Sequence, residues 1–202
     1  MFQPLLVTDR RGGIDPRASR TLMRERSLPN VALIGFMGTG KTLLGRMLAH
    51  RWGWRFVDTD ALVEQKVGCS VAQIFERFGE EYFRQQETEV LRSLENLHRV
   101  VIATGGGVPT RTDNVISLRR HAVIVWLTAQ PEVILQRVQP IHTRPKLASA
   151  AEPLAEIRRL MSERETAYAC ADIRLDTSTL SPEEAVERIE ELVRRWKPRN
   201  LT

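Results

Sequence analysis

The chain has 202 residues, of which 42% are hydrophobic and 27% charged, a composition typical of one folded domain with a sizeable core. The net charge of +5 does not by itself indicate a nucleic-acid-binding protein, because proteins that bind small anions also need an excess of positive charge. The two cysteines are far apart and no apolar run approaches the roughly 18 residues of a membrane helix, so we expect a cytoplasmic protein without disulfides or membrane segments.

Residues 1–29 form a leader without sustained hydrophobic periodicity. Its arginines, glycines and prolines are typical of disorder. The arginines also fit a transit peptide, although the acidic residues of the leader are unusual in one, and Met23 offers an alternative start. We therefore predict a folded domain at residues 30–197, followed by a short tail at 198–202.

From residue 30 onward, short β-rich runs alternate with longer helical patterns, which indicates an α/β domain with a parallel sheet flanked by helices. Capping boxes are predicted at Ser70 with Gln73 and at Ser181 with Glu184, so helices should begin directly after both serines. We expect strands at 31–34, 55–57, 100–103, 122–127 and 172–175, and helices at 41–52, 71–78, 81–97, 112–120, 131–137, 154–168 and 182–196.

Residues 35–42, GFMGTGKT, match the phosphate-loop pattern G-x-x-x-x-G-K-[ST] between an expected strand and an expected helix. Backbone N–H groups of such a loop face phosphate oxygens, and the helix N-terminus adds favourable partial charge. Lys41 should reach the β and γ phosphates, and Thr42 should bind Mg²⁺. The residues expected to contact the nucleotide here are Gly38, Thr39, Gly40, Lys41, Thr42 and Leu43.

A phosphate loop alone does not identify the acceptor, because GTPases, motors and small-molecule kinases share it. The chain has no Asn-Lys-x-Asp guanine signature and is short for a motor, which favours a small-molecule kinase.

Two carboxylates, Asp58 and Asp60, follow the second expected strand. The carboxyl ends of parallel strands line the ligand crevice, and residues two apart project the same way on extended backbone. One carboxylate could then lie near Mg²⁺ and an acceptor hydroxyl, while the other accepts hydrogen bonds from the substrate. The alternative is a helix N-cap followed by an exposed acid.

Several motifs together resemble the shikimate kinase family over residues 30–196. They are the phosphate loop with Gly45-Arg46, residues 56–60 (FVDTD), Phe83-Arg84 with Glu87, Thr104-Gly105-Gly106-Gly107, Thr143-Arg144-Pro145, Arg164 with Tyr168, and Asp176-Thr177. The resemblance implies a three-layer P-loop kinase fold, similar to nucleoside monophosphate kinases, with a five-stranded parallel sheet in the order 2-3-1-4-5. It also implies a mobile lid at about 139–151.

The activity implied by this resemblance is ATP-dependent phosphorylation of the 3-hydroxyl of shikimate, a step of aromatic amino-acid biosynthesis. Asp58 would lie near Mg²⁺ as the candidate base, and Asp60 would bind the ring hydroxyls. Arg84 and Arg164 would hold the carboxylate, because a guanidinium matches it bidentately. Bare backbone would approach the substrate at three glycines: Gly105, Gly106 and Gly107.

Two further arginines receive roles from the resemblance. Arg144 in the lid would join Lys41 and Asp58 in catalysis by supporting charge on the transferring phosphoryl group, and Arg137 would lie beside the adenine. Lys146 stands where the family commonly has leucine, and residues 178–181 lack an arginine that many members place near the adenine. The expected ligands are ATP, Mg²⁺ and shikimate. We expect a monomer that binds neither nucleic acid nor membrane.

Two alternatives stay open. A gluconate-type sugar-acid kinase shares the phosphate loop and the size, but it gives no account of the aspartate pair, Phe83-Arg84 or the triple glycine. A non-catalytic regulator could keep the fold and bind nucleotide, although Lys41, Thr42 and Asp58 are intact.

Overall fold

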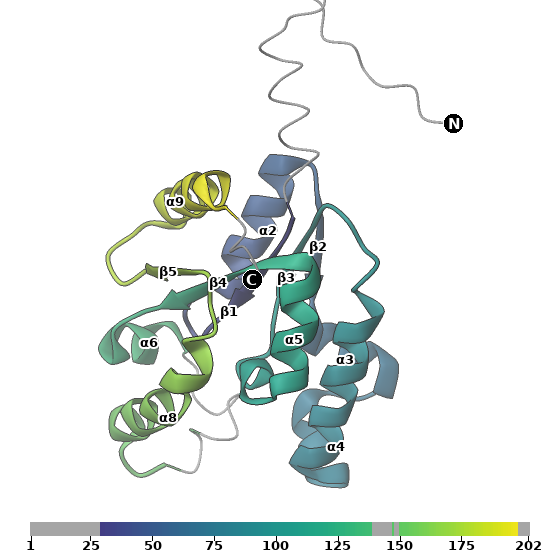
Figure 1. The fold of residues 1–202 in the computed structure, drawn as a ribbon. Helices are drawn as coiled ribbons and strands as arrows, with labels where there is room; N and C mark the ends of the chain where they lie inside the picture. The colour runs from purple at the N-terminus through teal and green to yellow at the C-terminus, as the bar shows by residue number, and fades with distance from the viewer. Residues whose placement is uncertain (1–28, 139–146, 148–149, 198–202) are drawn as a thin grey trace, which may run out of the picture.

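The computed structural model describes residues 29–138, 147 and 150–197, which form a sheet with helices on both faces (Figure 1). The strands are β1 (Asn30–Ile34), β2 (Arg55–Asp58), β3 (Val100–Ala103), β4 (Ala122–Thr128) and β5 (Ile173–Asp176). Their order in the sheet is β2-β3-β1-β4-β5, and every pair of neighbours is parallel. The expected fold class and strand order are therefore confirmed.

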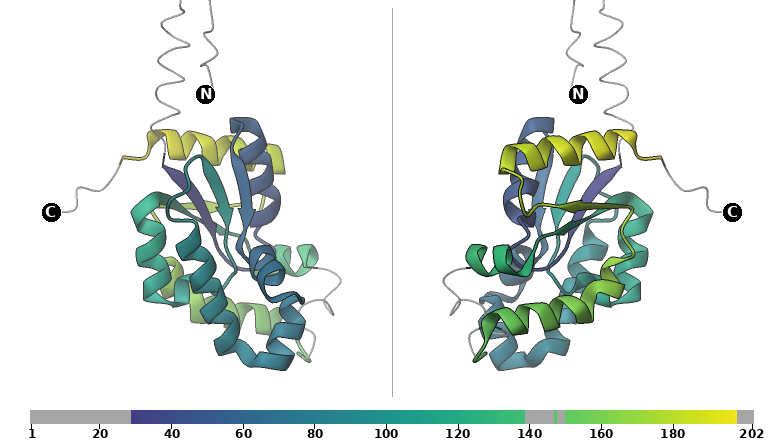
Figure 2. Two further views of the ribbon diagram at one scale, coloured as in Figure 1. Left: turned by 90° about the vertical axis from the view of Figure 1, so that its right-hand side faces the viewer. Right: turned by 90° about the vertical axis from the view of Figure 1, so that its left-hand side faces the viewer.

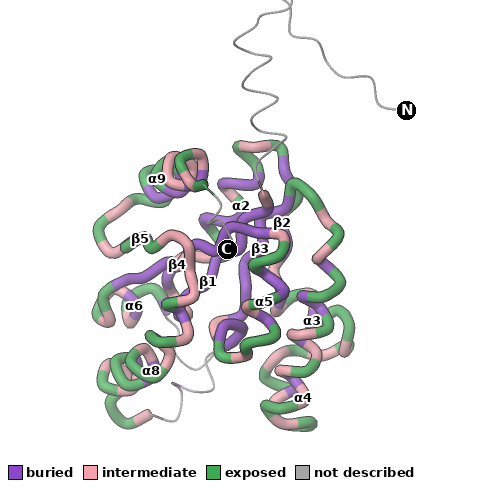
Figure 3. The backbone as a smooth tube through the Cα atoms, in the orientation of Figure 1, coloured by how far each residue is buried: buried purple, intermediate pink, exposed green. Residues whose placement is uncertain are grey.

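Two helical layers enclose the sheet (Figure 2). Val31 and Leu33 of β1 face α2 and α9, whereas Ala32 and Ile34, on the opposite face of the strand, pack with residues of α4, α5 and α8. The central strands β1, β3 and β4 are almost entirely buried, whereas β2 and β5 and the outer sides of the helices have exposed residues (Figure 3). The helices are α2 (Lys41–Trp52), α3 (Thr59–Val67), α4 (Val71–Ser93), η1 (Val108–Thr110), α5 (Thr112–His121), α6 (Pro131–Arg137), α8 (Pro153–Tyr168) and α9 (Pro182–Arg195).

Local sequence signals explain most helix boundaries. Both predicted capping boxes are present, so α4 begins after Ser70 and α9 begins after Ser181. Helix α2 ends at Gly53, whose φ of 61° is in the left-handed region that favours glycine. In the part of the chain that the structure describes, no helix is long and apolar enough to cross a membrane.

The helices expected at 71–78 and 81–97 are the two halves of α4, and the predicted break between them is confirmed, because Gly79 has the non-helical angles φ 81° and ψ 170°. The structure differs from the prediction in three places. Helix α3 and the short η1 were not predicted, and α4 ends at Ser93 rather than at residue 97.

Candidate active site

The phosphate loop joins β1 to α2 at the carboxyl edge of the sheet. Gly40 precedes α2 with a φ of 95°, which a residue with a side chain rarely adopts. The ammonium group of Lys41 donates hydrogen bonds of 2.8 Å to the carbonyls of Gly35 and Phe36, so it lies over the loop. The Thr39 hydroxyl also donates to the Phe36 carbonyl at 2.8 Å, and this hydrogen bond stabilises the turn of the phosphate loop.

Asp58 lies at the end of β2 and faces the start of α2. Its Oδ2 accepts a hydrogen bond of 2.8 Å from the Thr42 hydroxyl, and its Oδ1 accepts from the backbone N–H groups of Asp60 and Ala61 at 3.1 and 3.4 Å. Asp58 is therefore the N-cap of α3, and the extended backbone expected through Asp60 is wrong. The helix N-cap alternative describes the backbone correctly, but it is incomplete because both carboxylates face one cavity.

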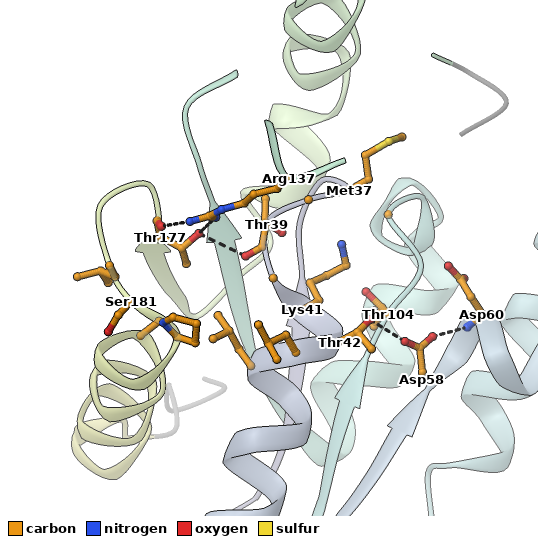
Figure 4. Close-up of a pocket in the computed structure, with 18 residues that line it drawn as sticks. Met37, Thr39, Lys41, Thr42, Asp58, Asp60, Thr104, Arg137, Thr177 and Ser181 are labelled. Carbon is orange, nitrogen blue, oxygen red and sulfur yellow. Dashed lines mark hydrogen bonds between the residues drawn. The ribbon is translucent and has the colours of Figure 1, made fainter. Parts of the chain in front are cut away.

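That cavity, which we call the loop cavity, has a volume of about 580 Å³ and runs along the phosphate loop. Figure 4 shows Thr42, Asp58 and Asp60 on one side of it, with Arg137 and Thr177 on the other. It brings together most of the residues predicted to contact nucleotide or metal: Gly38, Thr39, Gly40, Lys41, Thr42, Leu43, Asp58 and Arg137.

Arg137 is held in place by the segment after β5. Its guanidinium donates to the Thr177 hydroxyl at 3.0 Å and to the Thr177 carbonyl at 2.7 Å. The Thr177 hydroxyl lies 3.3 Å from the Thr39 carbonyl, which links this segment to the phosphate loop. Arg137 therefore lies at the end of the loop cavity that is opposite the two aspartates.

A second cavity of about 410 Å³, which we call the arginine cavity, adjoins the first. Its walls include every residue predicted to bind the substrate: Asp60, Arg84, Gly105, Gly106, Gly107 and Arg164. Arg84 comes from α4 and Arg164 from α8, so the two guanidinium groups approach from different helices.

Glu87 is a site residue to which the sequence assigned no role. Its side chain is fully buried and forms an ion pair with Arg84, three residues earlier on α4, while Glu80 contacts the same guanidinium at 3.0 Å. The spacing of three residues on one helix was the signal that could have indicated this pair. The pair fixes Arg84 beside the glycine run, where a Cβ on Gly107 would collide with its guanidinium.

The carboxylates of Asp60 and Glu87 both lie beside Gly105, where a side chain of that residue would be. A Cβ at Gly105 would collide with Oδ1 of Asp60 and Oε1 of Glu87, so this position favours glycine. Both oxygens are buried and have no hydrogen-bond partner among the described residues. Buried acceptors without partners are unusual in folded proteins, and here they border the arginine cavity.

Burial dominates the electrostatics of this pair. It raises the pKa of Glu87 to about 7, although Arg84 opposes the shift. Burial, and after it the charge of Asp58, also raise the pKa of Asp60 above its ordinary value. Both raised pKa values mean that burial disfavours the charged carboxylates beside the glycine run, so hydrogen-bond donors from a ligand would stabilise these carboxylates.

Arg144 and most of the segment predicted as a lid, 139–151, lie outside the described residues. The leader, 1–29, is outside them as well except for Pro29, and so is the tail at 198–202.

Comparisons with known proteins agree with this geometry. The family model described as shikimate kinase matches residues 37–194. Shikimate kinase of Geobacter sulfurreducens is 48% identical over 165 residues, which cover 82% of this chain and 91% of the relative. That of Caldanaerobacter subterraneus subsp. tengcongensis is 45% identical over 162 residues, or 80% and 94% of the two chains.

The fold is shared as well. The structure of shikimate kinase from Acinetobacter baumannii in complex with shikimate has a TM-score of 0.79 and 36% identity, and the match covers 83% of this chain and 94% of that one. The sequence match spans most of the chain, and the matched fold includes the five-stranded sheet that carries both cavities. The chain therefore belongs to the shikimate kinase family.

Proposed function

We propose that this protein transfers the γ-phosphoryl group of ATP to the 3-hydroxyl of shikimate, giving shikimate 3-phosphate and ADP in aromatic amino-acid biosynthesis. The observation that carries the proposal is that the two cavities share a wall, because Met37, Asp60 and Gly106 line both. An acid held by Arg84 and Arg164 would thus present its hydroxyls to the phosphate loop. The family of the chain and its similarity to a shikimate complex support the identity of the acid.

In this proposal the loop cavity holds ATP. The phosphates would lie against the backbone of residues 38–40 and the N-terminus of α2, where N–H groups and the helix dipole favour anions. Lys41 would exchange the loop carbonyls that it contacts now for the β and γ phosphates. Leu43 and Arg137 would lie towards the nucleoside, where they line the cavity.

Thr42 and Asp58 are suitable ligands for Mg²⁺. A hydroxyl and a carboxylate oxygen 2.8 Å apart match the preference of this ion, which binds through one or two protein oxygens, waters and substrate phosphates. Among residues 29–138, 147 and 150–197, no group of three or more His, Cys, Asp or Glu side chains gathers as a metal cage. When bound, the ion would neutralise charge on the phosphates.

For this reaction the protein must position the reactants and place cations where negative charge develops on the phosphoryl group. Asp58 would orient the attacking hydroxyl as the candidate base, and Asp60 would accept hydrogen bonds from the ring hydroxyls. Lys41 would support charge on the transferring group. Arg144, which the sequence places in a lid, is proposed to do the same from the opposite side and to exclude water.

In the arginine cavity, Arg84 and Arg164 would bind the carboxylate of the acid. The backbone of Gly105, Gly106 and Gly107 would approach the ring. A Cβ at Gly105 or Gly107 would collide with the charged groups already described, so these positions favour glycine. One chain lines both cavities, so we propose that the protein works as a monomer. We propose as well that it works in the cytoplasm, without nucleic acid or membrane partners.

An assay of ADP release with a panel of hydroxy acids tests the function. We expect turnover with shikimate, and much lower kcat/KM with gluconate and with a shikimate ester that lacks the free carboxylate. Turnover of gluconate in preference to shikimate would favour the sugar-acid alternative, and no turnover of any acid would favour a regulator.

A further inference from the structure

The carbonyl group of Gly106 receives two hydrogen bonds from helix α8. The Tyr168 hydroxyl donates to it at 2.7 Å, and Nη1 of Arg164 donates to it at 3.3 Å. The two donors are four residues apart on α8, so they lie on the same face of the helix. A carbonyl oxygen has two lone pairs and can accept both.

The two hydrogen bonds differ in strength. A separation of 2.7 Å is usual for O–H···O, whereas 3.3 Å lies beyond the usual range for N–H···O. Tyr168 therefore holds the Gly106 carbonyl firmly, and Arg164 is held loosely. A loosely held guanidinium readily exchanges a neutral carbonyl for a carboxylate, because charge-assisted hydrogen bonds are stronger.

Gly106 faces the two cavities, whereas Tyr168 lies behind Gly106 in the protein interior. Gly106 lines both the loop cavity and the arginine cavity, and Arg164 lines the arginine cavity. Tyr168 lines neither cavity and is only 2% exposed, with its ring 5.6 Å from that of Trp126 between centroids. The hydroxyl of Tyr168 thus acts on the wall from behind, without reaching the space that a substrate would occupy.

We propose that Tyr168 is a positioning residue for the acid: its hydroxyl holds the Gly106 carbonyl and thereby releases Arg164 to bind the substrate carboxylate. The inference rests on the proposed function, because it takes the acid as the ligand of Arg164. Without the hydroxyl, Arg164 would be the one side chain among the described residues left to satisfy this carbonyl. The acid would then compete with Gly106 for the guanidinium.

The hydroxyl of Tyr168 is a dependable donor. Burial raises the pKa of Tyr168 above its ordinary value, although the nearby Arg164 opposes the shift. The phenol therefore stays protonated at neutral pH and keeps its hydrogen bond to Gly106 while the acid binds.

The test is a double-mutant cycle with Tyr168→Phe and Arg164→Ala, read as kcat/KM for shikimate. We expect Tyr168→Phe to raise the KM for shikimate about threefold to tenfold, the effect of one hydrogen bond, with little change in kcat or in the KM for ATP. In the Arg164→Ala background the same change should have no further effect. The matched control is Tyr82→Phe, because Tyr82 is the other tyrosine of the chain and packs against the exposed Phe78, outside both cavities.

A second measurement does not need the Tyr168→Phe variant. Since the chain has two tyrosines, incorporation of 3-fluorotyrosine into the Tyr82→Phe variant labels Tyr168 alone. Saturating shikimate should shift the fluorine resonance of this label, because Arg164 leaves the shared carbonyl, whereas ADP alone should not.

Three outcomes would overturn the inference while the wild type still turns over shikimate. They are an unchanged KM in folded Tyr168→Phe protein, an equal effect in the Arg164→Ala background, and a fluorine resonance that shikimate leaves in place. A wild type that does not turn over shikimate would overturn the proposed function, and this inference with it.

Discussion

The Thr42 hydroxyl and the Asp58 carboxylate are joined by a hydrogen bond of 2.8 Å, which connects the first turn of α2 to the end of β2. The same carboxylate caps α3, so Asp58 has a structural and a proposed catalytic role at once. A useful substitution must separate the two roles.

Asp58→Asn makes that separation, because asparagine caps helices about as well as aspartate. We expect kcat to fall at least about a hundredfold, the range for loss of a general base, with a much smaller rise in the KM for the acid. Asp58→Ala should in addition lower the free energy of unfolding by about 1 kcal/mol through loss of the cap. An effect of Asp58→Asn confined to KM would contradict the catalytic role.

Lys41→Ala should nearly abolish turnover and leave the fold intact. The ammonium group would stabilise charge on the transferring phosphoryl group, and loss of one such donor costs about 10²- to 10³-fold in kcat. Lys66→Ala is the matched control, since Lys66 of α3 forms an exposed ion pair with Glu89 of α4, away from both cavities. A folded Lys41→Ala protein with most of its activity would refute the assignment as a kinase.

Arg164→Ala should lower kcat/KM for shikimate about tenfold to over a hundredfold, because it removes hydrogen bonds to a charged group. The KM for ATP should barely change. The wild type should prefer shikimate to its ester, and the variant should lose that preference. Full preference for the acid in the variant would show that Arg164 does not bind the carboxylate.

Arg84 needs a different design because Glu87 is buried against it. Arg84→Ala alone should lower the free energy of unfolding above pH 7 by about 3 to 5 kcal/mol, since it leaves a buried carboxylate unpaired. The double variant Arg84→Ala, Glu87→Gln should recover most of this stability and still bind the acid weakly. Full affinity of the double variant for the acid would contradict the role of Arg84.

Glu87 should make the free energy of unfolding decrease as the pH rises, whereas a carboxylate stabilised by an ion pair makes it increase. Its pKa of about 7 in the folded protein exceeds the ordinary value of 4.5, so the folded state binds a proton that the unfolded state releases. Its contribution to stability therefore falls as the pH rises from 4.5 to 7, and Glu87→Gln should reduce this fall by about 1 to 3 kcal/mol.

Urea unfolding at a series of pH values measures this effect. Glu89→Gln is the matched control, because Glu89 is on the same helix but its side chain is 55% exposed. Parallel curves of stability against pH for wild type and Glu87→Gln would mean that Glu87 does not titrate differently in the two states.

The strands were predictable because β1, β3 and β4 are largely apolar runs and β2 and β5 combine apolar with charged residues, and every strand lies within one residue of its expected bounds. Helix α3 was missed for a specific reason: the aspartate pair was interpreted on extended backbone. In the structure Asp58 caps that helix and Gly68, with a φ of 80°, ends it. The sequence contained both the N-cap and the glycine that ends the helix. Between them, however, only Thr59 and Val63 are buried, so the segment has no clear apolar stripe.

The site was predictable where its residues are neighbours along the chain, as in the phosphate loop and the aspartate pair. The burial of Glu87 and the hydrogen bond of Tyr168 to Gly106 depend on packing between distant segments, 62 residues apart in the second case. Residue type and spacing do not reveal such contacts. The resemblance to a family named Arg84 and Arg164, whereas their supporting residues became apparent only from the structure.

Asn30, at the opposite end of β1 from the phosphate loop, has a consequence for strand register. Its side chain donates to the Leu97 carbonyl at 2.6 Å and accepts from the Val100 backbone N–H at 3.1 Å. Strands β1 and β3 are buried on both faces, so their apolar sequences alone would not reject a slip by one residue. Asn30 makes such a slip costly, because it would leave buried polar groups unpaired. It thereby determines, from the far edge of the sheet, how far the phosphate loop stands from the glycine run that follows β3.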